Sequence, residues 1–273
     1  MPRWLLAGLA APGGIVLAGF FLAPLATVAA EAFGGDGGAF ARVLGDPVFW
    51  RGLAGSSALA AAAATVSLAV GAAVALHLSR LGERARLMLQ FLIALPLTFS
   101  GLIVAYGFIL AFGRAGFVTM LLAEVGVDPA AFAGFIYGPF GLAFAYAYYL
   151  VPRVVMLLLP VLVNFDHQQI AAAEAMGARR WRALLDVLVP QVLPTALSAW
   201  CLVAAVAFGA YGTALALVGT QVNILPLLLY SKISEGGSDF PAAAALSLVL
   251  MAACTLVMAV AELFAATREQ AAH

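Results

Sequence analysis

The sequence is poor in charged residues. Asp, Glu, Lys and Arg make up 10% of its 273 residues, whereas a soluble globular domain carries about 25%. A water-soluble surface cannot be built from so little charge, so the surrounding solvent must be lipid. The formal net charge is zero, which gives no sign of a nucleic-acid partner.

Reactive and metal-binding side chains are also scarce. The two cysteines, Cys201 and Cys254, lie inside apolar runs and are interpreted as buried thiols. The three histidines, His77, His167 and His273, are scattered and form no His-Glu-x-x-His array. We therefore predict no catalytic residue and no metal site, and a membrane enzyme is disfavoured.

What the sequence does contain is long apolar runs. A membrane-crossing helix needs about 20 apolar residues, and backbone groups in lipid must be paired within their segment. The N-terminal run after Arg3 exceeds the apolar core of a secretory signal, so we interpret it as a retained first helix. We predict an all-α polytopic membrane protein with a single domain over residues 1–273. Its six spans should lie at about 12–33, 53–78, 88–112, 135–158, 193–218 and 242–265.

Arginine and lysine are distributed unevenly between the connecting segments. With the N-terminus in the cytoplasm, nine lie inside: Arg3, Arg80, Arg84, Arg86, Arg153, Arg179, Arg180, Arg182 and Arg268. Four lie outside: Arg42, Arg51, Arg114 and Lys232. Because basic residues are enriched in cytoplasmic loops, we predict that both termini are cytoplasmic.

The inside segment at about 164–190 has the features of a short helix. Residues 168–176 are rich in alanine and favour a helix. Asp166 stands where it can cap this helix, with Gln169 completing an approximate capping box. Gly177 is a natural stop, and a basic cluster follows it. Small residues on such a helix let another protein approach closely.

This segment resembles the EAA loop of ABC-importer permeases. The family pattern is Glu-Ala-Ala, three residues, Gly, nine residues, then aliphatic-x-Leu-Pro. With Gly177 aligned to the family glycine, the pattern matches Ala172, Ala173, Val187, Val189 and Pro190, and similarity extends to Ala178, Trp181, Pro194 and Val151-Pro152-Arg153. Ala171 departs from the pattern, because the family has Glu there; Glu174 lies one turn later on the same face.

The resemblance implies the type I importer permease fold, with the short helix as a coupling helix. The implied contacts with the ATPase subunit are Gln169, Ala172, Ala173, Glu174, Gly177, Ala178 and Arg179. ATP and Mg would then be bound by two copies of a separate ATPase subunit, and this chain contains no phosphate-binding Gly-x-x-x-x-Gly-Lys-Ser/Thr loop. The other implied partners are a second permease chain, a periplasmic or lipid-anchored solute-binding protein, and the lipid of a bacterial inner membrane.

The stretch 208–219 resembles permeases for polyamines, ferric iron, thiamine and phosphonates, and we expect a polyamine first. Residues that could line the path are Thr98, Ser100, Tyr106, Tyr211 and Thr213; Tyr146, Tyr148 and Tyr149 are further polar side chains in the spans. Helix packing is the simpler role for most of these groups. Pro96 should interrupt the third span.

An ion-coupled secondary transporter is the alternative function. Such a protein usually needs a carboxylate inside the membrane. Glu31 and Glu262 lie near the ends of their spans and can reach water, which counts against this alternative.

Overall fold

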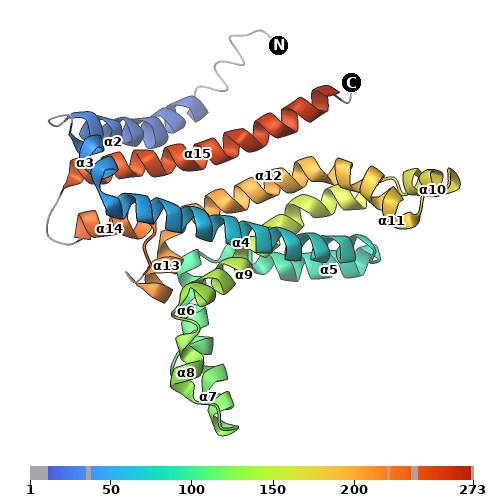
Figure 1. Ribbon diagram of the computed structural model, residues 1–273, viewed down its shortest axis with the longest axis horizontal. Helices are drawn as coiled ribbons and strands as arrows, with labels where there is room; N and C mark the ends of the chain where they lie inside the picture. Colours follow the sequence, from blue (N-terminus) through green and yellow to red (C-terminus); the bar gives the residue numbers. More distant parts are fainter. Residues whose placement is uncertain (1–11, 35–37, 220–221, 235–238, 272–273) are drawn as a thin grey trace. The chain divides into compact units, whose positions relative to one another are not determined.

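The computed structural model describes residues 12–34, 38–219, 222–234 and 239–271 (Figure 1). Within these ranges every regular element is a helix, which confirms the all-α prediction. Six stretches are long and apolar enough to cross a membrane: Pro12–Gly34, Pro47–Ser79, Gly101–Glu124, Pro139–Val163, Arg180–Phe208 and Phe240–Val260. Arg3, residues 35–37 and 235–238, and His273 lie outside the described residues.

The contacts group the chain into two compact units. The first unit comprises Met1–Leu53 and Asn223–Ala253. Its described helices are η1 (Ala18–Leu22), α2 (Ala23–Gly34), α3 (Ala39–Gly45), α14 (Leu225–Ser234) and parts of α4 (Pro47–Ser79) and α15 (Phe240–Ala271).

The second unit comprises Ala54–Val222 and Cys254–His273. Besides the rest of α4 and α15, it contains α5 (Glu83–Ala94), η2 (Leu95–Thr98), α6 (Gly101–Phe112), α7 (Phe117–Glu124), α8 (Pro129–Gly134), α9 (Pro139–Val163), α10 (Gln168–Ala175), α11 (Arg180–Ala183), η3 (Leu184–Leu188), α12 (Val189–Phe208) and α13 (Tyr211–Val218). Helix α9 is its centre, because α5, η2, α6, α12 and α13 all pack against it. Leu142, Leu150, Val154 and Leu158 of α9 are fully buried in these contacts.

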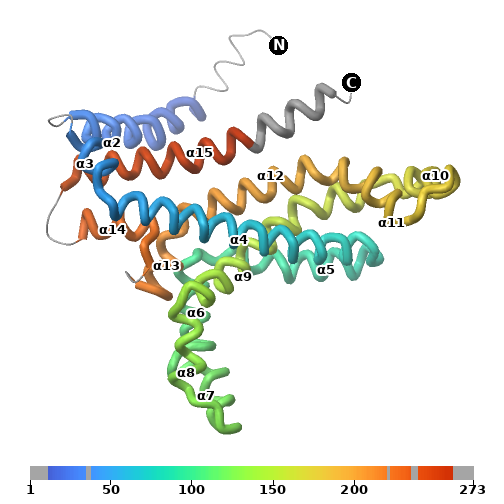
Figure 2. Tube along the Cα trace, viewed as in Figure 1, coloured from blue at the N-terminus to red at the C-terminus, as the bar shows by residue number. Residues whose placement is uncertain are grey.

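Within this second unit, α10 and α11 belong to the loop that joins the C-terminal end of α9 to the N-terminal end of α12 (Figure 2). The chain leaves α9 at Val163, turns through α10, and re-enters α12 through α11 and η3. A short helix therefore stands between two long apolar helices, which is the position expected for the loop at 164–190.

The third expected span, 88–112, is not one helix in the structure. Helix α5 ends at Ala94, a 3₁₀ turn contains Pro96, and Phe99 and Ser100 have extended backbone before α6 begins at Gly101. Pro96 lacks an N–H and its ring clashes with the preceding turn, so the predicted interruption is a full break. The stretch here that is long and apolar enough to cross a membrane is Gly101–Glu124.

The fifth span also differs from the expected 193–218. The helical run starts at Arg180 and ends at Phe208, and α13 follows as a separate helix. The second half of the expected loop is therefore helical. A π-helical turn, η3, precedes Pro190; such a turn accommodates the hydrogen bond that proline cannot make.

Candidate coupling helix and translocation site

Helix α10 begins at a side-chain cap supplied by Asp166. The Asp166 carboxylate accepts a hydrogen bond of 2.9 Å from the backbone N–H of Gln168. The backbone carbonyl oxygen of Asp166 accepts a second one from the N–H of Gln169. These contacts pair N–H groups that a free helix start would leave without a partner. The role predicted for Asp166 is confirmed.

Helix α10 ends in a Schellman motif at Gly177. The Gly177 N–H bonds to the Glu174 carbonyl at 2.9 Å, and the Ala178 N–H bonds to the Ala173 carbonyl at 3.1 Å. Gly177 has a φ of +92°, and an added Cβ would meet no atom within 4 Å. Glycine is therefore required here by its backbone conformation and not by lack of space.

Gln169 does not complete the capping box that the sequence suggested. Its side-chain oxygen instead accepts a hydrogen bond of 2.6 Å from the side-chain amide of Gln191 in α12. The bond joins the short helix to a long apolar helix across 22 residues of sequence. The bond is therefore a direct contact between α10 and α12.

The alanines of α10 face in different directions. Ala172 is exposed, whereas Ala173 is only 9% exposed and is buried against its own chain. Ala172 is therefore accessible to another protein, whereas Ala173 is covered by its own chain. The exposed surface around Ala172 also includes Met176, of which 83% is exposed.

A cavity of about 450 Å³ opens between α10, α11 and the end of α4. Its charged lining residues are Arg80, Glu174 and Arg180, and Ala171 and Glu174 both line it. Ala171 and Glu174 thus share a face, as their spacing predicts. That face looks toward the basic side chains of this chain.

A second polar centre lies where α12 and α13 separate. The Tyr146 hydroxyl, on the buried face of α9, donates a hydrogen bond of 2.9 Å to the carbonyl oxygen of Ala210. Gly209 and Ala210 form the break, and α13 begins at Tyr211 without a side-chain cap. Its first N–H groups therefore point from the break without a capping side chain.

The start of α6 packs closely on α13. A Cβ added to Gly101 would lie 2.4 Å from the Thr213 hydroxyl oxygen, so only glycine permits this approach. The Tyr149 hydroxyl is a neighbour of the Thr213 hydroxyl. Both are buried; they lie close enough to interact with each other, and neither bonds to another described group. Two buried hydroxyls, one on α9 and one on α13, therefore lie next to each other, and that of Thr213 lies beside the start of α6.

The five predicted path residues are only partly brought together. Ser100 caps α6, Thr213 lies against Gly101, and Tyr211 starts α13, so these three gather at the breaks. The Thr98 hydroxyl is bonded to the carbonyl of Leu95. Tyr106 lies more than one turn into α6 and is 56% exposed.

Arg153 lies one helical turn from Tyr149 and was missed as a candidate. Its guanidinium donates a hydrogen bond of 3.2 Å to the Tyr149 carbonyl oxygen and lies 5.6 Å from the centre of the Tyr149 ring. The sequence suggested a position near the inner end of the span. A charge inside an otherwise uncharged helix was the signal that could have identified it.

A comparison with protein families identifies the class of the molecule. Residues 67–269 match the family described as "Binding-protein-dependent transport system inner membrane component". The chain belongs to this family. It is a permease subunit of an ABC importer, which confirms the resemblance to ABC-importer permeases.

Individual relatives of the permease transport different solutes according to their names. This chain is 28% identical over 238 residues to "Sulfate permease 2, chloroplastic" of Chlamydomonas reinhardtii. The match covers 86% of this chain and 63% of that protein's length. The chain is 27% identical over 219 residues to the spermidine/putrescine transport system permease protein PotB of Salmonella typhimurium, covering 80% of this chain and 74% of that protein.

A solved structure supports the fold of the permease. A chain of a bacterial alginate ABC transporter, crystallised in complex with a pentasaccharide-bound periplasmic protein, superposes with a TM-score of 0.72. The match covers 94% of this chain and 92% of the alginate transporter chain at 17% identity. It shows a shared fold.

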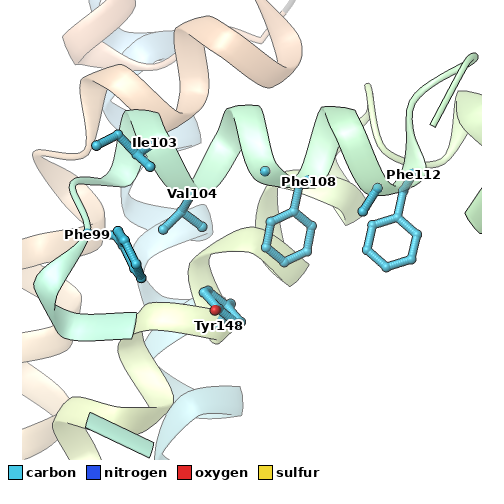
Figure 3. A pocket seen from close by; sticks show the side chains of 8 residues that line it. Phe99, Ile103, Val104, Phe108, Phe112 and Tyr148 are labelled. Atoms are coloured by element: carbon cyan, nitrogen blue, oxygen red, sulfur yellow. The ribbon is translucent and has the colours of Figure 1, made fainter. Parts of the chain in front are cut away.

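The permease also has an apolar pocket of about 370 Å³ between α6 and α9. The side chains of Phe99, Phe108 and Tyr148 border it (Figure 3). The Phe108 ring lies edge-on to the Tyr148 ring, with 5.5 Å between their centres. The lining carries no charged group, so this pocket cannot by itself hold an ion.

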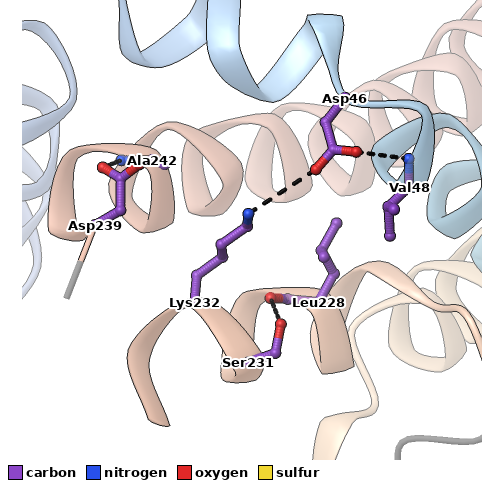
Figure 4. A network of polar contacts seen from close by, with 7 residues as sticks. All are labelled: Asp46, Val48, Leu228, Ser231, Lys232, Asp239 and Ala242. Carbon is purple, nitrogen blue, oxygen red and sulfur yellow. Dashed lines mark hydrogen bonds and ion pairs between the residues drawn. The ribbon is translucent and has the colours of Figure 1, made fainter. Parts of the chain in front are cut away.

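In the first unit of the permease, ion pairs hold the segment before α4 against α14 and α15. Lys232 lies 3.9 Å from Asp46 (Figure 4), and Arg42 lies 3.2 Å from Asp239. The backbone N–H of Ala242 bonds to Asp239 and, with Arg42, holds the pKa of that carboxyl below its ordinary value. These groups lie in α3, in α14 and just before α4 and α15.

Proposed function

We propose that the permease forms half of a translocation pathway and is driven by a separate ATPase subunit that binds α10. The observation that carries this proposal is the construction of α10. It is fixed at its start by Asp166, closed by Gly177 in a Schellman motif, and bonded to α12 through Gln169. It leaves Ala172 exposed, where a small side chain permits close contact with a partner.

The complete importer would contain two ATPase subunits, a second permease chain and a solute-binding protein. Six helices do not by themselves enclose a pathway that two ATPase subunits serve. The family description and the alginate transporter complexed with a periplasmic protein support this composition. ATP and Mg would be bound by the ATPase subunits, and the permease itself would have no catalytic role.

The composition can be tested by purifying the full chain with an affinity tag from membranes of its source cells. We expect a complex with two permease chains and two ATPase subunits, identified by mass spectrometry, whose ATP hydrolysis rises with substrate-loaded binding protein. A permease that transports solute after purification to a single component would contradict the proposal. That result would favour the alternative, an ion-coupled secondary transporter.

We further propose a bacterial inner-membrane location with both termini in the cytoplasm. In this orientation Arg80 and Arg180 beside α10 face the cytoplasm, as the enrichment of basic residues in cytoplasmic loops requires. Single cysteines can test it in a variant lacking Cys201 and Cys254. A cysteine at Glu83 should be labelled only from inside and one at Glu124 only from outside; both positions are exposed. The reverse pattern would invert the orientation.

A further inference from the structure

Helices α6, α9, α12 and α13 of the second unit contain a single charged residue, Arg153. It is the fifteenth of the 25 residues of α9, ten residues before the end that leads to α10. That distance is about 15 Å along the helix. Arg153 therefore lies well inside a stretch that is long and apolar enough to cross a membrane.

The side chain of Arg153 points away from the nearer end of α9. A lysine or arginine near a membrane surface usually extends its charge toward the closer interface. The Arg153 guanidinium instead reaches back to the carbonyl oxygen and ring of Tyr149, in the direction of the helix breaks. The contacts with Tyr149 hold the charge toward the middle of α9, which is the ordinary direction of a side chain in a helix.

No acidic side chain lies within 4 Å of the Arg153 guanidinium among the described residues. Asp186, in η3, lies near the start of the apolar stretch Arg180–Phe208. The other acidic residues with described side chains in this unit lie in or beside the connecting segments: Glu83, Glu124, Asp128, Asp166 and Glu174. Charged groups in membrane helices almost always face the bundle interior or a water-filled path and have a counter-charge. Arg153 is partly exposed and has no counter-charge among the described residues, so it could pair with an anion.

The surroundings of Arg153 also favour negative charge. One turn away, the Tyr149 hydroxyl meets that of Thr213 at the starts of α6 and α13. Helix N-termini carry partial positive charge and bind anions through free N–H groups. Each of these hydroxyls has only the other as a described polar neighbour, and a hydroxyl can donate a hydrogen bond to an oxyanion.

We propose, on the basis of the importer function above, that Arg153 selects a small oxyanion as the transported solute. Sulfate, phosphate and phosphonates share the chemistry required, which is negative oxygen that accepts charge-assisted hydrogen bonds from a guanidinium. A polyamine, which the sequence resemblance favoured, carries ammonium groups that Arg153 repels. The four helices offer those ammonium groups no carboxylate.

Uptake by cells that express the complete transport system tests this proposal. The probes are sulfate, phosphate and methylphosphonate as anions, and putrescine, spermidine and thiamine as cations. We expect ATP-dependent uptake of at least one of the anions and none of the cations. Uptake confined to cations, or ATP-driven import with no response to any of the three anions, would overturn the proposal.

Variants then test Arg153 itself. Arg153→Gln should raise the KM for the anion at least about tenfold, since a charged hydrogen bond is lost, and Arg153→Lys should restore part of the affinity. Arg114→Gln, which removes an exposed charge outside these helices, is the control and should leave KM unchanged. An unchanged KM in Arg153→Gln at normal membrane levels would show that Arg153 does not bind the solute.

The two proposals fail in different ways. If no ATPase copurifies with the chain, the importer function is wrong whatever the charge of the solute. If an ATPase copurifies and drives uptake of a cation, only the assignment of an oxyanion is wrong. The measurement of copurification therefore precedes the uptake assays.

Discussion

Gln191 in α12 donates a hydrogen bond of 2.6 Å to the side chain of Gln169 in α10. This contact joins the proposed ATPase-binding helix to a helix that is long and apolar enough to cross the membrane. Both side chains are exposed, so the bond contributes little to the stability of the fold. We interpret its main effect as a mechanical link between the two helices.

The first prediction concerns this link. Gln169→Ala and Gln191→Ala should each reduce substrate-stimulated ATP hydrolysis severalfold, and the double variant should do no worse than either single variant. The bond contributes about 0.5–1.5 kcal/mol, and a double-mutant cycle measures it as the shortfall from additivity. Gln168→Ala, at an exposed neighbouring position, should have no effect. Additive losses in the double variant would show that the two glutamines act independently.

A second prediction concerns the end of α10. Gly177→Val places a β-branched residue at a φ of +92°, which costs about 1–2 kcal/mol and opens the Schellman motif. The amount of ATPase that copurifies should fall, with normal insertion of the permease into the membrane. Gly82→Val is a matched control because Gly82 has a φ of −61° and open space around it. Equal losses in both variants would contradict this account of Gly177.

How much could be predicted from the sequence is illustrated by the two ends of α10. Asp166 and Gly177 act through their immediate neighbours in the chain, so capping rules predicted both. Pro96 was predicted to interrupt a helix for the same reason, because its missing N–H is a local property. The distant bond between Gln169 and Gln191 could not be predicted, since it depends on how α10 folds back against α12.

Burial and side-chain direction also required the structure. Ala172 and Ala173 are identical in sequence terms, yet one is exposed and the other is covered by its own chain. Arg153 was counted among the basic residues on the inside, because its position alone does not reveal that the side chain contacts Tyr149. The extended backbone at Phe99 and Ser100 was likewise not predicted from the sequence.

A third prediction concerns the break between α12 and α13. Tyr146→Phe removes the hydroxyl that bonds to the Ala210 carbonyl and leaves that oxygen without a partner, at a cost of about 1–3 kcal/mol. The detergent-purified permease should melt at a lower temperature. Tyr148→Phe should melt at the wild-type temperature, because Tyr148 is 46% exposed and borders an apolar pocket. Equal melting temperatures of the two variants would show that the Tyr146 hydroxyl does not stabilise the break.

The most direct test of the central claim, that α10 binds an ATPase subunit, is copurification of the ATPase with Ala172→Arg. Ala172 is exposed, so the variant should insert normally but bury an unpaired charge at the contact, a cost of about 3–5 kcal/mol. Ala130→Arg, at an exposed position on α8, is the control, whereas Ala173→Arg should reduce membrane levels because Ala173 is buried. The account predicts that Ala172→Arg loses the ATPase while Ala130→Arg retains it. Wild-type amounts of ATPase bound to Ala172→Arg would contradict the assignment of α10 as the coupling helix.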